Sequence, residues 1–305
     1  MANIPAFIIL SEMIMTKKIL TVTLNPAVDR IVSVGKGDIG RFYAGGKGIN
    51  VARAARALGM DVSAIGVEGG VTGWMLEELL QQEGLPHRFF VVDGATRVNT
   101  TRIAKSGTVT RDFQPGPLLR EPERKAFAKF FSGQLKGRAA VVFSGSLPPG
   151  FPVASFTALI RAARRSGALV VVDTSGAALA AALKEAPDVI KPNREEAGEA
   201  LGFRLSSRAH IRKALRSFQG CGIKKALISL GRDGMAAYDG REEAWVKLPV
   251  VRGGHGVGCG DAALAGFLAA QLKGKNFRAS VRQAAVCGRA AMAADKPGGI
   301  KRRTS

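Results

Sequence analysis

The chain is poor in cysteine and in aromatic residues. Its 305 residues include three cysteines, Cys221, Cys259 and Cys287, and no CxxC pair. This count argues against a disulfide framework and a zinc site, and it fits a reducing, cytoplasmic location. Only 6% of the residues are aromatic, which is poor for stacking nucleic-acid bases.

Acidic residues are also scarce, with 24 Asp and Glu against 45 Lys and Arg, a formal net charge of +21. Such a charge can attract nucleic acid, an anionic membrane surface or an anionic substrate. The cations are spread along helix-like stretches such as RAARALG and RAARRSG instead of forming a tail. We interpret them as solvated helix faces and expect no specific nucleic-acid partner.

Long hydrophobic runs and the common nucleotide-binding signatures are missing. The apolar start is interrupted at Ser11 and Glu12 and lacks a basic region, so we expect neither a signal peptide nor a membrane partner. Met15 looks like an alternative start, so residues 1–14 look dispensable. We therefore place an N-terminal extension and the start of the first strand in 1–18. Neither GxxxxGK[ST] nor a GxGxxG that follows a strand occurs.

The most informative stretch is a glycine-rich turn that ends at Asp261. Five glycines lie between 253 and 260, and the strong helix formers AALAGFLAAQL follow Asp261. The N–H groups of Gly258, Cys259 and Gly260 can converge on an anion at such a helix start. A carboxylate beside an anion site suits phosphoryl transfer. The alternative is that Asp261 only caps the helix.

Apolar strands alternate with helical patterns along the chain, for example at 19–24, 61–67, 139–144 and 168–173. This order predicts an α/β fold whose central sheet has helices on both faces. Polar residues follow the predicted strands, which predicts a site at the carboxyl ends of the strands. They are Asp29, Ser144, Ser146, Asp173, Lys191, Asn193, Ser229 and Asp261.

Two further segments stand apart from this alternation. Short strand patterns at 28–34 and 88–113 have no helices between them and predict a small side sheet. A second glycine turn, AGGKGIN at 44–50, precedes a predicted helix at 49–58 and could bind an anion or a polyol. The alternative for this turn is a plain glycine-rich connection.

Eight segments together resemble the ribokinase-like carbohydrate kinases of the pfkB family, and within it the phosphosugar kinases. The resemblance implies a three-layer fold over 19–305, with a mostly parallel central sheet and a small, shortened β lid from about 28–44 and 88–113. The segments occur in the family's order: TVTLNPAVD (21–29), AGGKGINVARA (44–54), TRVN (96–99), FSGSLPPG (143–150), VVDTSG (171–176), IKPNREE (190–196), ISLGRDG (228–234) and GVGCGDAALAGF (256–267).

The resemblance also implies roles for individual residues. Asp261 would be the catalytic base, and Gly258, Cys259 and Gly260 would form the anion hole. Asn193 and Glu196 would act on Mg²⁺ largely through water, although by spacing alone they are a helix-cap pair. Residues that would bind ATP are Lys191, Asn193, Ser229, Gly231 and Gly234. Residues that would hold sugar hydroxyls are Asp29, Gly45, Gly46, Lys47 and Asn50, and those for the acceptor's existing phosphate are Arg97 and Ser146.

The implied reaction is ATP- and Mg²⁺-dependent phosphorylation of a phosphorylated ketohexose, with fructose 1-phosphate as the first choice. Tagatose 6-phosphate and fructose 6-phosphate are the close alternatives, and a non-catalytic sugar-phosphate or nucleotide-binding protein is the remote one. The span from Asn25 to Gly45 is short for the family, which argues against a full lid and a lid-mediated homodimer. Lys36 and Arg41 are candidates for the lid's basic phosphate ligands.

Overall fold

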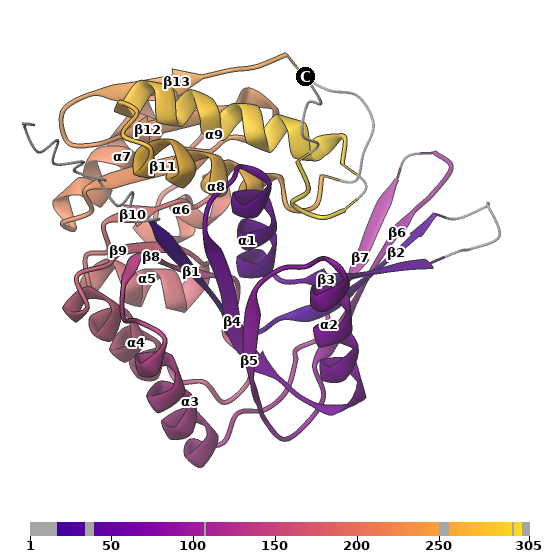
Figure 1. The fold of residues 1–305 in the computed structure, drawn as a ribbon. Coiled ribbons are helices and arrows are strands. Elements are labelled where there is room, and N and C mark those ends of the chain that lie inside the picture. The colour runs from indigo at the N-terminus through magenta and orange to yellow at the C-terminus, as the bar shows by residue number, and fades with distance from the viewer. Residues whose placement is uncertain (1–16, 34–39, 107, 250–255, 295, 301–305) are drawn as a thin grey trace, which may run out of the picture.

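The structure, a computed structural model, describes residues 17–33, 40–106, 108–249, 256–294 and 296–300. Within these ranges the chain forms a main sheet of nine strands, a separate sheet of four strands, and helices that pack on the main sheet (Figure 1). The predicted extension at 1–14 lies outside the described residues. None of the helices in the described ranges is long and apolar enough to cross a membrane.

The main sheet is mostly parallel, because seven adjacent strands all run in the same direction. The two remaining strands, at one edge, add antiparallel pairings. The order across the sheet is β13 (Glu243–Val246), β12 (Met235–Tyr238), β11 (Lys225–Ser229), β10 (Val189–Ile190), β9 (Leu169–Asp173), β8 (Arg138–Ser144), β1 (Lys18–Thr23), β4 (Val62–Glu68) and β5 (His87–Val91).

Helices cover both faces of this sheet, as the alternation of strands and helices predicts. In β8, Val141 and Phe143 belong to one buried cluster, whereas Ala140 and Val142 belong to the other. One cluster includes residues of α3 (Glu121–Gly133), α4 (Val153–Arg165), α5 (Gly176–Lys184), α6 (Arg194–Leu201) and α7 (Arg208–Gly220). The other includes residues of α1 (Lys47–Ala57), α2 (Gly70–Gln82), α8 (Cys259–Leu272) and α9 (Phe277–Met292).

The second sheet lies beside the main sheet and extends away from it in Figure 1. Its order is β3 (Gly40–Gly45), β2 (Ala27–Ser33), β6 (Arg97–Ile103) and β7 (Val109–Asp112), with β2 and β6 parallel. The residue pattern does not predict β3, where a glycine turn is expected to begin at Ala44. This strand depends on pairing with β2, which local propensity does not report. The expected domain boundaries stay predictions, and so does the expectation that the short lid does not support a homodimer.

Candidate active site

The glycine turn before Asp261 starts α8 three residues earlier than a capping role for Asp261 would require. Gly258 is the N-cap in a left-handed conformation with φ of 79°, and α8 begins at Cys259. The interpretation of Asp261 as an N-cap is therefore wrong, because Asp261 is the third residue of the helix and is buried. A Cβ at Gly258 would lie 2.2 Å from the backbone N of Gly298, so only glycine fits this close approach.

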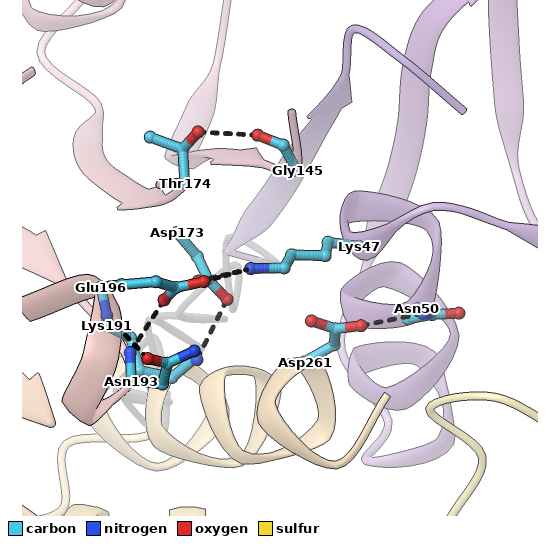
Figure 2. A network of polar contacts seen from close by, with 9 residues as sticks. All are labelled: Lys47, Asn50, Gly145, Asp173, Thr174, Lys191, Asn193, Glu196 and Asp261. Carbon is cyan, nitrogen blue, oxygen red and sulfur yellow. Dashed lines mark hydrogen bonds and ion pairs between the residues drawn. The ribbon is translucent and has the colours of Figure 1, made fainter. Parts of the chain in front are cut away.

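Neighbouring residues fix the position of the Asp261 carboxylate and shift its pKa (Figure 2). Nδ2 of Asn50, on α1, donates a hydrogen bond of 2.8 Å to Oδ2 of Asp261. Burial, with a further contribution from Asp173, raises the pKa of Asp261 to about 6, while Lys47, Asn50 and Lys191 act in the opposite direction. A carboxylate with a pKa close to neutrality is suited to general-base chemistry.

A second carboxylate, Asp173 at the end of β9, is completely buried between two lysines. Its Oδ2 lies 3.1 Å from Nζ of Lys191, and its Oδ1 lies 3.5 Å from Nζ of Lys47. Burial alone would raise the pKa of Asp173, but the two ammonium groups together hold it below its usual value. The same Asp173 raises the pKa of Lys47, so that lysine stays charged.

The two lysines also reach the elements that the sequence assigns to phosphate. A Cβ on Gly260 would lie 3.2 Å from Nζ of Lys191, so this ammonium group sits beside the glycine turn. Nζ of Lys47 lies 3.4 Å from Oε1 of Glu196. The structure thus places Lys47 among the residues expected to face ATP and magnesium, although the resemblance assigns it to sugar hydroxyls.

Asn193 and Glu196 form a capping box at the start of α6. Oδ1 of Asn193 accepts from the backbone N–H of Glu196, and Oε2 of Glu196 accepts from the backbone N–H of Asn193, both at 2.8 Å. The cap-pair interpretation is therefore confirmed. The capping box uses Oε2 of Glu196, and Oε1 faces the ammonium group of Lys47. The Oε1 atom therefore already binds a cation, and a carboxylate oxygen is the kind of ligand that Mg²⁺ prefers. The residues present fit a hydrated magnesium ion.

A cavity of about 770 Å³ opens beside the glycine turn and is lined by Cys259 and Gly260. The predicted nucleotide residues Asn193, Ser229, Gly231 and Gly234 also line it, so the structure brings these segments together. Its remaining wall includes Ala285, Gly288 and Met292 of α9, to which the sequence analysis assigned no role. A stripe of small residues on one helix face was the available signal, but such stripes usually mean close helix packing.

On the other side of the site, Asp29 lies within β2 and not after a strand of the main sheet, which corrects the expected placement. Nδ2 of Asn99, on β6, donates a hydrogen bond of 3.1 Å to Oδ1 of Asp29. A Cβ at Gly45 would come within 2.3 Å of the Asp29 carboxylate, so Gly45 makes room for it. Burial raises the pKa of Asp29 above its usual value. The sequence indicates Asn99 only as part of the TRVN segment, and the register of β2 and β6 is what pairs it with Asp29.

Arg97 and Ser146 meet at Asn25, which follows β1. Nδ2 of Asn25 donates to Oγ of Ser146 at 3.2 Å, and the backbone oxygen of Asn25 accepts from Nη2 of Arg97 at 2.9 Å. Arg97 also donates to the backbone oxygens of Pro26 and Gln114. A guanidinium carries five N–H groups, so these three contacts leave donors for an anion.

Of the two basic lid residues predicted from the sequence, the structure describes Arg41. Arg41 lies on β3, two residues from Tyr43, which is the cross-strand partner of Asp29. Residues two apart on a strand share a face, so Arg41 and Asp29 lie on the same face of the second sheet. Lys36 lies outside the described residues.

Comparison with known proteins assigns the chain to a family. The pfkB family carbohydrate kinase profile matches residues 14–301. The chain belongs to the pfkB family of carbohydrate kinases. It is 34% identical over 271 residues to a 1-phosphofructokinase from Xanthomonas campestris, covering 85% of each chain. It is 33% identical over 259 residues to a 1-phosphofructokinase from Bacillus subtilis, covering 82% of this chain and 84% of that one.

The fold agrees with this assignment. Phosphofructokinase-2 from Escherichia coli, solved in complex with fructose-6-phosphate, superimposes with a TM-score of 0.83 at 31% identity, covering 90% of this chain and 93% of that one. The pfkB resemblance and the ribokinase-like α/β fold are thus confirmed. A kinase of this family is a phosphotransferase that uses ATP and an alcohol acceptor. The roles of the individual residues stay predictions.

The burial of Asp173 predicts how stability responds when one lysine is lost. Lys191→Met leaves a buried carboxylate with a single, longer ion pair, so we expect a loss of about 3 kcal/mol in unfolding free energy near pH 8. In the variant, burial raises the pKa of Asp173 and the folded state binds a proton more readily than the unfolded state. The loss should therefore shrink as the pH falls towards about 5. Urea denaturation across this range checks it.

The matched control is Lys125→Met, which removes an exposed lysine paired with Glu121 on the surface of α3. Surface pairs of this kind contribute little to stability, so its unfolding free energy should stay close to that of the unchanged chain at every pH. Equal losses for the two variants would contradict the role given to the buried carboxylate.

Proposed function

We propose that this kinase transfers the γ-phosphoryl group of ATP to O6 of fructose 1-phosphate and forms fructose 1,6-bisphosphate. The observation that carries the reaction type is a buried carboxylate, Asp261, with a pKa near 6 at a glycine turn beside two ammonium groups. The two relatives named 1-phosphofructokinase support the choice of acceptor. Fructose 6-phosphate is the second candidate, favoured by the similarity to the Escherichia coli enzyme crystallised with that sugar.

In this proposal the acceptor sugar lies between the two sheets. Asp29 and Asn99 bind its hydroxyl groups, and Arg97 and Ser146 bind the phosphate that it already carries. Asp261 takes the proton from the attacking hydroxyl, because Asn50 occupies Oδ2 of its carboxylate and leaves Oδ1 for the sugar.

ATP would occupy the cavity of about 770 Å³, with its phosphates towards Gly260. The backbone N–H groups of Gly258, Cys259 and Gly260, together with Lys191 and Lys47, would stabilise the negative charge that develops on the transferred group. Glu196, and Asn193 through water, would hold Mg²⁺. When bound, this ion neutralises charge on the nucleotide phosphates.

The test of the proposal is ATP turnover with Mg²⁺ against a panel of acceptors. The panel contains fructose 1-phosphate, fructose 6-phosphate, tagatose 6-phosphate and unphosphorylated fructose. We expect the highest kcat/KM with fructose 1-phosphate. We also expect Asp261→Asn to lower kcat by at least about 100-fold while ATP binding, followed by calorimetry, persists. Near-normal turnover in Asp261→Asn, or selective use of fructose itself, would refute the assignment.

The pKa of Asp261 predicts the acid side of the pH profile. Asp261 is a base only when ionised, so kcat should fall as the pH drops below about 6. Asn50→Ala removes a hydrogen bond that favours the ionised form, and it should move this limb upward by about one pH unit. The phosphate of the sugar also titrates near pH 6. A limb that stays in place in Asn50→Ala would therefore belong to the substrate and not to Asp261.

The position of Arg97 predicts a selective effect on the acceptor. Arg97→Ala should raise KM for the sugar phosphate at least about tenfold, because a charge-assisted contact to phosphate is lost. KM for ATP should change little, since the nucleotide cavity is formed by other elements. Initial rates with each substrate varied in turn check this. Similar increases in both KM values would mean that Arg97 acts through the backbone oxygens that it holds.

A further inference from the structure

Arg53, on α1, has a guanidinium group whose hydrogen-bonding capacity is completely used inside the protein. Nε and Nη2 donate to the two carboxylate oxygens of Glu83 at 2.6 and 3.1 Å. Nη1 donates to Oδ1 of Asn50 at 2.7 Å and to the backbone oxygen of Pro297 at 2.6 Å, and Nη2 donates to the backbone oxygen of Ala44 at 2.6 Å. These five bonds use all five N–H groups of an arginine.

The bond to Asn50 fixes which way its amide faces. Because Arg53 binds Oδ1, the NH₂ group of Asn50 must point to Asp261, where it donates at 2.8 Å. Asp261 by itself holds this orientation only while it is ionised. Once it has taken a proton, the carboxyl group can donate as well as accept, and only the arginine keeps the amide in place.

The bond to Pro297 holds a segment that packs against the glycine turn before Asp261. The neighbouring residue, Gly298, packs against both Asn50 and Gly258, since a Cβ at Gly298 would lie 2.8 Å from Cβ of Asn50. The N–H of Gly298 also donates to the backbone oxygen of Val257 at 3.3 Å. Arg53 therefore ties the segment at 297–298 to the turn that precedes Asp261.

The anchor for these contacts is Glu83, which follows α2. The Arg53 and Glu83 side chains are each only 10% exposed, so their two-bond ion pair is largely shielded from water. A lysine could not replace this arrangement, because an ammonium group lacks the planar fork that reaches four partners at once.

We propose that Arg53 is a positioning residue of the kinase reaction, which orients the Asn50 amide towards Asp261 and holds the 297–298 segment against the turn at Gly258. This inference rests on the proposed function, because the reaction is what gives Asp261 its role. It assigns Arg53 an effect on the rate of the chemical step, transmitted through Asn50, and no contact with either substrate.

The first measurement is kcat, both KM values and the pH profile of Arg53→Lys in the full chain. Displacing the base by an ångström can cost about 100-fold, so we expect a fall in kcat of that order with little change in either KM. The acid limb of kcat should move upward by about one pH unit. The control is Arg56→Lys, an exposed arginine on the same helix, which should leave both unchanged.

A double-mutant cycle shows whether the effect passes through Asn50. The shift of the acid limb should be the same in Asn50→Ala and in Arg53→Lys with Asn50→Ala. Additive shifts, or a limb that stays in place in Arg53→Lys, would overturn the proposal. The other groups that face Asp261 and titrate or carry charge are unchanged in every variant: Asp173, Lys47, Lys191 and Cys259.

Failure of the proposed function can be told apart from failure of this inference. If the unchanged chain turns over no acceptor in the panel, the function fails, and the pKa of Asp261 is then read by carboxyl ¹³C NMR, with Asp261→Asn used to assign its signal. A pKa that rises in Arg53→Lys supports the positioning role without any activity, and an unchanged one overturns it.

If Arg53→Lys does not fold, Glu83→Gln takes its place, because it weakens the anchor and keeps the guanidinium. It should give a smaller shift in the same direction, and no shift would overturn the proposal.

Discussion

One buried negative charge, that of Asp173, determines how the active site is arranged. A carboxylate removed from water is costly unless cations reach it, and Lys191 and Lys47 do so from two different elements. Together with Glu196 and an ionised Asp261, these groups leave one net negative charge at the place proposed for the phosphates. A nucleotide would be repelled by it unless a divalent cation arrives with the phosphates, which supports the proposal that magnesium is required.

The parts of the site that are local in sequence could be predicted. The turn at Gly258 and the helix after it follow from glycines and helix formers that lie side by side. The alternation of apolar strands and helices predicts a parallel sheet, and hence a site at the ends of its strands. Even here the pattern alone left open whether Asp261 capped the helix or lay within it. The structure decides between them, because α8 begins at Cys259 after Gly258 in a left-handed conformation, which places Asp261 inside the helix.

Contacts between distant residues could not be predicted in this way. Asp173 was visible as an acid at the end of an apolar strand, but nothing local indicates that two lysines would surround it. Arg53 looks like one more cation on a basic helix, and its burial depends on Glu83, thirty residues later. Asn99 becomes informative only through the register of β2 and β6. In each case the tertiary fold, and not propensity, supplies the partner.

The second sheet is separate from the main sheet, and in the proposed reaction it would hold the sugar against Asp261. Arg97 provides a fixed point, because it is on β6 and binds the backbone of Asn25 and Pro26, where the main sheet leads into β2. Gly45 at the end of β3 leads directly into α1, which carries Lys47, Asn50 and Arg53. Asp29 is therefore held between two connections to the catalytic elements, and a shift of the second sheet would disturb the acceptor and the base together.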